Sequence, residues 1–255
     1  MRTIHIALLS AMPEEVGVAL DHLEKVSCSE YGDLKIYSGK WRPNDNNTDS
    51  VNISLAWSGW GKVSAARAAT RLIAHSSNNI PIDLILFTGV AGSVDSRFHQ
   101  WDVIVAEELI QHDMNATPLF ERFYIPALTK DRLRPSKKWL DFVFSSLKNA
   151  KRNGYLNEFG LIKKGLIGTG DCFISDKNDI DKLKDSIPDL KAVEMEGASV
   201  AQVALQEGIP WIIVRVISDE ADESAHQSFN KFLEIYKQYA WNILKVILTQ
   251  YKKIP

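Results

Sequence analysis

Two acidic segments stand where apolar strands are expected to end, and they are the most chemically suggestive features of the chain. Glu194 and Glu196 flank a methionine in an apolar stretch that leads into a helical segment. Asp219 comes just after the apolar run 211–217. Open α/β sheets place their chemistry at the carboxyl ends of strands. Because a buried carboxylate is costly unless it is paired, protonated or used, these acids indicate an acid–base site.

Asp219 is predicted to act as a general acid. Its place after the most apolar strand should desolvate the carboxyl group, raise its pKa and favour the protonated form. The alternative is that Asp219 only caps the turn that follows. Arg215 in the same run is expected to pair with a buried acid, and Glu194 is the candidate. In an extended strand Glu194 and Glu196 would point to opposite faces, so that only one of them reaches a pocket.

Glu14 and Glu15 follow the first apolar run and Pro13, which favours the start of a helix. Acidic residues in a first helical turn complement the helix dipole, and this alone could explain both of them. The alternative is that one of the two faces the carboxyl edge of the sheet, where it orients or deprotonates a water molecule.

Two glycine-rich segments, 58–62 and 88–92, each follow a predicted strand. Glycines let a backbone approach a ligand closely, although plain tight turns remain an alternative. Neither segment is a Walker loop or a dinucleotide-binding fingerprint. Trp60, between two glycines, is predicted either to stack on a ligand or to fill the core.

No metal site is expected. Cys28 and Cys172 have no metal-type spacing and are predicted to be free thiols, which is consistent with a reducing cytosol. The histidines are scattered and form no metal-binding motif. His112 and His226 are expected to be surface or hydrogen-bonded residues.

The elements that must position these residues alternate along the chain. Strands are predicted over 3–9, 33–41, 51–57, 82–87, 101–109, 160–168, 192–195 and 210–217, and helices over 13–23, 61–75, 136–151, 177–184, 196–207 and 226–251. The polar stretch 43–50 is predicted to be an exposed turn, and 112–135 a long functional loop. This alternation predicts one domain over 1–255, a three-layer α/β/α fold around a central mixed, mainly parallel sheet.

Composition excludes several classes of protein. The chain has 255 residues, of which 45% are apolar and 24% charged, and a net charge of −2. This balance argues against a nucleic-acid binder, which would carry a basic face. No apolar run approaches the about 20 residues of a membrane span. The apolar start is interrupted by His5 and followed by Pro13, so a first strand is favoured over a signal peptide and a cytoplasmic protein is expected.

Six motifs taken in order resemble the nucleoside phosphorylase superfamily, and most closely its 5′-methylthioadenosine/S-adenosylhomocysteine nucleosidases. They are AMPEEV at 11–16, SGWGK at 58–62, TGVAG at 88–92, GDCFI at 170–174, VEME at 193–196 and RVISD at 215–219. The resemblance extends from about residue 3 to residue 245, and the occurrence of all six motifs in family order is far more specific than any one of them.

The resemblance implies roles for the acids and for the residues around the base. Glu15 corresponds to the glutamate that positions and deprotonates the attacking water. Asp219 corresponds to the aspartate that protonates adenine N7, and Ser218 helps to orient it. Phe173 corresponds to the aromatic residue that stacks on adenine, and the backbone of Ile174 to the group that reads the base edge.

The remaining substrate-binding residues surround the sugar and its 5′ substituent. Met195 and Glu196 resemble the residues beneath the ribose, with Glu196 accepting hydrogen bonds from its hydroxyls, and Phe229 matches a pocket wall near the alkylthio tail. The full set of expected substrate-binding residues is Trp60, Val90, Ala91, Gly92, Phe173, Ile174, Glu194, Met195, Glu196 and Phe229.

The implied reaction is hydrolysis of the N-glycosidic bond of 5′-methylthioadenosine, S-adenosylhomocysteine or both. It releases adenine and the thioribose in methionine salvage and in the recycling of methylation by-products. Water is the co-substrate and no metal or organic cofactor is required, because the reaction needs a proton on the leaving group and a water on the opposite face of the sugar. In the family, the loop that corresponds to 113–123 comes from a neighbouring subunit, which implies a homodimer.

The chain departs from the family at several positions. Val90 replaces a small hydroxyl residue, Trp60 replaces a smaller aliphatic one, and residues 114–135 match the family poorly. The preferred nucleoside and its tail therefore stay open.

Three other functions remain as alternatives. A phosphorylase of the same superfamily would use phosphate, which an anionic Glu15 would repel. A related hydrolase could act on futalosine-type or AMP-type nucleosides, although no basic cluster for a nucleotide phosphate is evident. A non-catalytic adenine-nucleoside binding module would have no need of a water-activating glutamate.

Overall fold

The computed structural model describes residues 4–43, 50–77, 80–219 and 225–250, and every structural statement below concerns these residues. The strands are β1 His5–Ser10, β2 Glu24–Tyr31, β3 Leu34–Trp41, β4 Val51–Trp57, β5 Leu84–Ser93, β6 Val103–Gln111, β7 Arg132–Leu133, β8 Ile162–Thr169, β9 Leu190–Glu194 and β10 Trp211–Asp219. The α-helices are α1 Lys62–Ser77, α2 Lys137–Arg152, α3 Lys177–Ser186, α4 Gly197–Gln206, α5 Ala225–Tyr236 and α6 Ala240–Thr249. Short 3₁₀ helices cover Pro13–Glu15, Gly17–His22 and Pro126–Leu128.

The strands form one mixed sheet, part of which closes on itself. Its order is β10-β6-β8-β9-β5-β1-β4-β3-β2, and β10 also pairs with β5. The strands β5, β10, β6, β8 and β9 therefore make a closed ring, while β1 to β4 extend from it as an open sheet. The two longest ladders, β10 with β5 and β6 with β8, are parallel, as buried strands joined by helical crossovers usually are.

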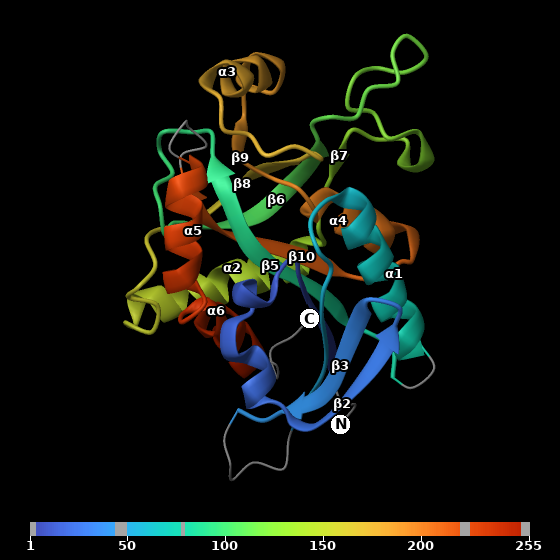
Figure 1. The fold of residues 1–255 in the computed structure, drawn as a ribbon, viewed down its shortest axis with the longest axis vertical. Coiled ribbons are helices and arrows are strands. Elements are labelled where there is room, and N and C mark those ends of the chain that lie inside the picture. The colour runs from blue at the N-terminus through green and yellow to red at the C-terminus, as the bar shows by residue number, and fades with distance from the viewer. Residues whose placement is uncertain (1–3, 44–49, 78–79, 220–224, 251–255) are drawn as a thin grey trace.

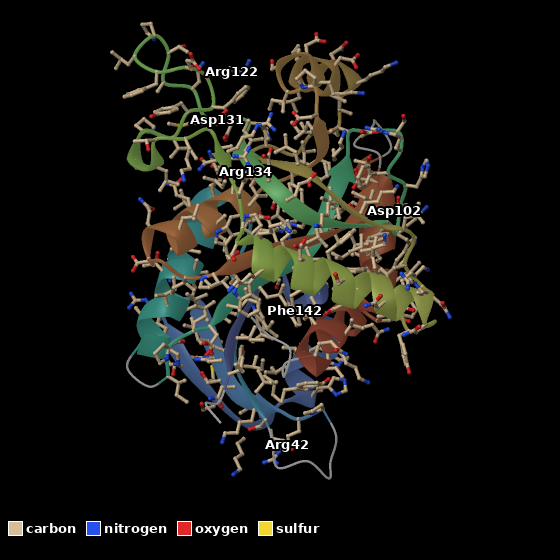
Figure 2. The ribbon with its side chains drawn as sticks, turned by 180° about the vertical axis from the view of Figure 1, so that it is seen from behind. Arg42, Asp102, Arg122, Asp131, Arg134 and Phe142 are labelled. Atoms are coloured by element: carbon tan, nitrogen blue, oxygen red, sulfur yellow. The ribbon has the colours of Figure 1, made fainter. Side chains whose placement is uncertain are left out.

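Helices cover both faces of the sheet, which confirms the predicted three-layer arrangement. Apolar side chains of α1 and α4 pack with one face of the strands in one buried cluster. Side chains of α2, α5 and α6 pack with the other face in a second cluster. Figure 1 shows the two groups of helices on opposite sides, and Figure 2 shows α2 with Phe142 from behind. No helix in the described ranges is long and apolar enough to cross a membrane.

Two predicted helices differ from the structure, and two strands, β2 and the short β7, were not predicted. The segment 13–23 is not one helix but two 3₁₀ turns, because Gly17 adopts a φ of +55° and a Cβ there would overlap the carbonyl oxygen of Lys237. The predicted last helix is two helices, since the chain turns at 237–239 and both parts pack into the same cluster. Strand β2 went unpredicted because most of its residues are exposed and show no alternating pattern. The predicted turn at 43–50 lies mostly outside the described residues.

The segment 88–92 is not the predicted turn but part of β5, which continues to Ser93. Its residues pair with β10, where Gly92 lies beside Asp219. A Cβ at Gly89 would overlap the Arg215 guanidinium group and the Glu15 carboxyl group, so only glycine fits where these side chains cross the strand. The glycine therefore serves the approach of two charged side chains rather than a change of chain direction.

Candidate active site

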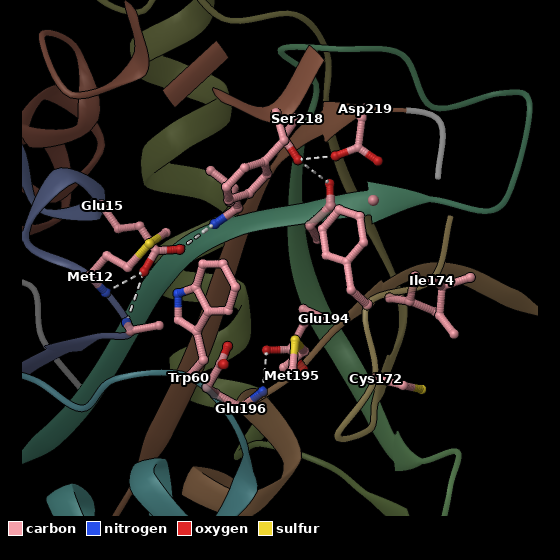
Figure 3. Close-up of a pocket in the computed structure, with 17 residues that line it drawn as sticks. Met12, Glu15, Trp60, Cys172, Ile174, Glu194, Met195, Glu196, Ser218 and Asp219 are labelled. Atoms are coloured by element: carbon pink, nitrogen blue, oxygen red, sulfur yellow. Dashed lines mark hydrogen bonds between the residues drawn. The ribbon is translucent and has the colours of Figure 1, made fainter. Parts of the chain in front are cut away.

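A pocket at the carboxyl ends of β1, β9 and β10 collects residues from seven separate segments of the chain. Figure 3 draws the 17 residues that line it. They are Ala11, Met12, Glu15, Trp60, Val90, Ala91, Gly92, Cys172, Phe173, Ile174, Val193, Glu194, Met195, Glu196, Ser218, Asp219 and Phe229. Every residue predicted for the site from the sequence is among them. Ala11, Met12, Cys172 and Val193 were not predicted, although each lies next to or within a motif.

Glu15 is buried, and its carboxyl group accepts hydrogen bonds from backbone N–H groups that follow β1 and from one in β5. Its Oε2 accepts hydrogen bonds from the N–H groups of Ala11 at 2.8 Å and Met12 at 2.9 Å. Its Oε1 accepts one from Val90 at 3.0 Å. Burial raises the pKa of Glu15, while the Arg215 charge and these three N–H groups oppose the rise. The carboxyl group is thus fixed in orientation and kept as a stronger base than an exposed glutamate.

Arg215 is completely buried in β10 and faces three glutamates. It binds Glu194 most closely, and its guanidinium nitrogens lie 3.4 Å from Glu196 Oε2 and 3.8 Å from Glu15 Oε1. The predicted pairing of Arg215 with Glu194 is confirmed. Since one cation serves three acids, the cluster keeps an excess of negative charge even when one of the acids is protonated.

Glu194 anchors the start of α4 in addition to binding Arg215. Its Oε2 accepts the N–H groups of Glu196 at 3.1 Å and Gly197 at 2.7 Å, and Thr169 donates to its other oxygen. A carboxylate at a helix N-terminus is favoured by the free N–H groups there. With both oxygens occupied, Glu194 is suited to positioning its neighbours.

Glu194 and Glu196 both line the pocket, which corrects the expectation that only one of them reaches it. The chain leaves the extended conformation at Glu196, where φ is −133° and ψ is −38°, so the alternation of a strand no longer applies. Glu196 Oε1 accepts a hydrogen bond of 2.9 Å from the N–H of Gly61. Burial and the nearby Glu194 charge raise the pKa of Glu196 to about 8. At pH 7 this carboxyl group is therefore mostly protonated.

Asp219 and Ser218 form a hydrogen-bonded pair at the end of β10. Ser218 Oγ lies 2.5 Å from Asp219 Oδ2 and 3.3 Å from the carbonyl oxygen of Ala91. The Ser218 hydroxyl group has one proton, so it donates either to Asp219 or to the Ala91 carbonyl oxygen, and the shorter contact favours Asp219. Asp219 is buried to 5% exposure beside Gly92 of β5.

Three aromatic side chains border the pocket. Trp60 and Phe229 meet edge to face with ring centroids 6.3 Å apart, and Phe229 meets Phe173 in the same way at 6.0 Å. Trp60 is 54% exposed, so the expectation that it fills the core is wrong and its place in the pocket wall agrees with the ligand-stacking alternative.

Within the described ranges, neither Cys172 nor the histidines add a nucleophile or a metal site. Partial burial and nearby acids such as Asp113 raise the pKa of the Cys172 thiol, which keeps it protonated. His112 is buried, with an Nε2 that has no hydrogen-bond partner in the described structure, so the expectation of a surface or hydrogen-bonded histidine is wrong. The side chain of His226 lies outside the described residues. Among the residues that are described, no cluster could hold a metal ion.

Comparisons with known proteins show similarity over nearly the whole chain. The phosphorylase superfamily model matches residues 5–249. A 5′-methylthioadenosine/S-adenosylhomocysteine nucleosidase from Glaesserella parasuis is 30% identical over 247 residues, which are 96% of this chain and 99% of the relative. The S-adenosylhomocysteine nucleosidase of Streptococcus pyogenes, solved with 5-methylthiotubericidin, superposes with a TM-score of 0.85 at 29% identity over 98% of each chain. The futalosine hydrolase of Helicobacter pylori superposes with a TM-score of 0.81 at 30% identity, over 96% of this chain and 97% of that one.

Proposed function

This chain belongs to the phosphorylase superfamily and, within it, to the 5′-methylthioadenosine/S-adenosylhomocysteine nucleosidases, and from that premise we propose that its pocket binds the nucleoside between Asp219 and Glu15. The reaction is hydrolysis of the N-glycosidic bond to adenine and the thioribose. The observation that carries this proposal is the pair of carboxyl groups in contrasting environments, on opposite sides of the pocket in Figure 3. Enzymes that cleave glycosidic bonds need one acid for the leaving group and one base for water.

Asp219 is the proposed general acid, and the adenine base is proposed to bind between Phe173 and residues 90–92 of β5. The Asp219 carboxyl group delivers its proton to N7 of adenine, so that adenine leaves as a neutral molecule. Ser218 orients the carboxyl group through the 2.5 Å contact. We expect the backbone of Ile174, which lines the pocket next to Phe173, to read the edge of the adenine base.

Glu15 is the proposed base for water. Each carboxylate oxygen has two lone pairs, and Oε1 accepts only the Val90 N–H among the described hydrogen bonds. The free lone pair can take a proton from a water molecule that faces the anomeric carbon. The three backbone donors fix this geometry before substrate arrives, which is the preorganisation that catalysis requires.

The ribose is proposed to lie over Met195 and Glu196. Glu15, Glu194 and Glu196 surround the single charge of Arg215, so even with a proton on Glu196 the cluster keeps a net negative charge. A negative environment stabilises the positive charge that develops on the sugar as the bond breaks. The same cluster thus holds the sugar and favours its cationic transition state.

Water rather than phosphate is the proposed nucleophile. The described pocket lining contains four carboxyl groups and no lysine or arginine. A phosphate nucleophile needs converging cationic donors, and the one nearby arginine is occupied by three glutamates. The geometry therefore favours hydrolysis over phosphorolysis.

The first experiment is product analysis of the purified protein with 5′-methylthioadenosine, with and without phosphate. We expect adenine and free methylthioribose in both conditions, at the same rate. A sugar 1-phosphate that forms only with phosphate would assign the chain to the phosphorylases instead. Futalosine is incubated with the protein in parallel, to test for the futalosine hydrolase activity named for the Helicobacter pylori neighbour. Tight nucleoside binding without any adenine release would support a binding module.

We also propose a homodimer in which the segment after β6 covers the neighbour's pocket. This segment stands away from the sheet in Figures 1 and 2, and Figure 2 labels Arg122 and Asp131 in it. It exposes Leu119 to 84% together with Phe120, and exposed apolar side chains of this kind are typical of interfaces. Light scattering should give twice the chain mass of 28.7 kDa, and Leu119→Asp should shift it towards one chain. A wild-type mass of one chain would contradict the dimer.

We propose a cytoplasmic location because both cysteines are free thiols. Cys28 and Cys172 are both free and exposed. Exposed free thiols are typical of proteins in a reducing compartment.

A further inference from the structure

Three charged residues beside the pocket, Lys62, Asp113 and Asp171, have no part in the proposed reaction and do not line the pocket. They come from three segments, since Lys62 begins α1, Asp113 follows β6 and Asp171 follows β8. The Lys62 N–H donates to Asp171 Oδ1 at 2.7 Å, and the Asp171 N–H donates to Asp113 Oδ2 at 3.0 Å. Lys62 Nζ lies 2.7 Å from Asp113 Oδ1 and closes the cycle. We call these three residues the loop clamp.

Asp171 supplies α1 with a helix cap that the local sequence lacks. The first N–H groups of a helix have no partner within it, and the side chain of the preceding residue often caps them. In α1 that residue is Gly61, which has no side chain and a φ of +91°. A Cβ at Gly61 would come within 3.0 Å of Asp171 Oδ1. The glycine therefore lets a carboxylate from another loop reach the N–H of Lys62.

On the sugar side, the loop clamp holds the segment that contacts Glu196. The N–H of Gly61, next to Lys62, donates to Glu196 Oε1 at 2.9 Å. Figure 3 shows Trp60, which precedes Gly61, close to Glu196 at one side of the pocket. The hydrogen bond between Lys62 and Asp171 thus adjoins the contact that orients the proposed ribose-binding carboxyl group.

On the base side, the loop clamp holds the segment that carries Phe173. This residue follows Asp171 by two positions, and its ring meets Phe229 edge to face at 6.0 Å. Among the described residues, the backbone of 172–174 makes no hydrogen bond. The nearest backbone hydrogen bond on the side of β8 that joins this segment to another loop is the one from the Asp171 N–H to Asp113. The position of Phe173 therefore depends on the residues of the clamp.

The two acids of the loop clamp differ in how many of their oxygens are used. Both oxygens of Asp113 accept hydrogen bonds, from Lys62 Nζ and from the Asp171 N–H. Partial burial opposes ionisation of Asp113, but these two donors lower its pKa and keep it anionic. Asp171 uses only Oδ1 among the described hydrogen bonds, and its donor is a neutral N–H. An asparagine could replace Asp171 in this contact but could not replace Asp113, because an amide has a single acceptor oxygen.

We propose that Asp171 is a positioning residue that fixes the base-stacking loop of Phe173 against the loop that orients Glu196. This inference rests on the proposed function, in which Phe173 contacts the adenine base and Glu196 the ribose. The loop clamp is formed before substrate binds, and it serves the ground state and the transition state alike. Its loss should therefore raise KM and leave kcat nearly unchanged.

The test compares kcat and KM for 5′-methylthioadenosine in four variants. Asp171→Ala should raise KM about tenfold, with kcat within about threefold of wild type, because the Lys62 N–H loses its acceptor. Asp171→Asn should restore KM to within about twofold, since its amide oxygen can accept the same N–H. Asp113→Asn should raise KM at least about fivefold, because its amide nitrogen must face one of two donors. Asp179→Ala, which removes an exposed 2.8 Å ion pair with Lys182 in α3, is the matched control and should change neither constant.

Amide hydrogen exchange tests the loop clamp without any ligand. The N–H of Gly61 keeps its acceptor Glu196 in every variant, so a change in its exchange rate reports on the loop rather than on a deleted partner. This N–H should exchange about tenfold faster in Asp171→Ala and at the wild-type rate in Asp171→Asn.

A KM that Asp171→Ala leaves within about twofold of wild type would overturn the proposal, as would an unchanged exchange rate at Gly61. Equal losses in Asp171→Ala and Asp171→Asn would also overturn it, because the charge of Asp171 rather than its hydrogen bond would then matter. The two hypotheses stay apart, since a wild-type protein that releases no adenine contradicts the proposed function, whereas the exchange rate at Gly61 decides on the clamp in either case.

Discussion

Replacing Asp219 with asparagine is expected to reduce kcat for 5′-methylthioadenosine by about 10²–10⁴, while the nucleoside still binds. An asparagine side chain has nearly the same shape as aspartate but cannot give up a proton to adenine N7. The loss corresponds to roughly 3–5 kcal/mol of transition-state stabilisation. Because Asp219 lies at the end of a fully buried strand, the isosteric change should leave β10 in place. Adenine release measures the rate, and calorimetry with the same nucleoside measures binding.

A substrate with a better leaving group is the control for Asp219→Asn, because it separates the loss of proton transfer from damage to the pocket. A p-nitrophenyl riboside leaves as a stable anion and needs no proton, so Asp219→Asn should cleave it at close to the wild-type rate. If the variant kept a kcat within threefold of wild type on 5′-methylthioadenosine, another group would be the acid. If both substrates were lost equally, Asp219 would be needed for the pocket rather than for proton transfer.

Glu15→Gln is expected to remove hydrolysis of both substrates by at least 10², because water attack follows the same path whatever the leaving group. Both Glu15 oxygens accept backbone N–H groups, from Ala11 and Met12 on one side and Val90 on the other. The amide nitrogen of glutamine must face at least one of these donors. The variant should therefore also lose about 1–3 kcal/mol of folding free energy. Single-turnover adenine release and thermal denaturation measure the two effects separately.

Glu14→Gln is the matched control for this experiment. Glu14 is the adjacent acid, but it does not line the pocket and is less buried. Its replacement should leave kcat within threefold of wild type. If Glu14→Gln were the inactive variant and Glu15→Gln the active one, the assignment of the water-activating base would be reversed.

The position of the site could be predicted from the sequence because most of its residues lie at or just beyond the carboxyl ends of strands. Each acid or glycine motif stands at the point where an apolar run ends, and parallel strands bring such points to one edge. Asp219 and the segment 88–92 show this, since the two are adjacent across the β5–β10 ladder. The alternation of strands and helices likewise predicted the layers.

Features that depend on distant contacts could not be predicted. The interruption at Gly17 is set by the carbonyl oxygen of Lys237, far away in the sequence. The sharing of Arg215 by three glutamates depends on side chains from the 3₁₀ helix after β1, from the end of β9 and from β10 meeting in space, and a single sequence carries no signal of that. The orientation of Glu196 depends on a backbone bend of one residue, which a pattern of alternation does not contain.

The closed ring of five strands also fixes when the site can form during synthesis. Strand β10 pairs with both β5 and β6, so these two strands lack their shared neighbour until residues 211–219 have been made. Pairings between strands so distant along the chain form late, because a long loop must close first. Asp219 arrives on that last strand, after Glu15, Trp60 and Glu196 are already in the chain. A growing polypeptide thus gains its proposed proton donor at the step that completes its sheet, so we expect nucleoside cleavage only from the finished fold.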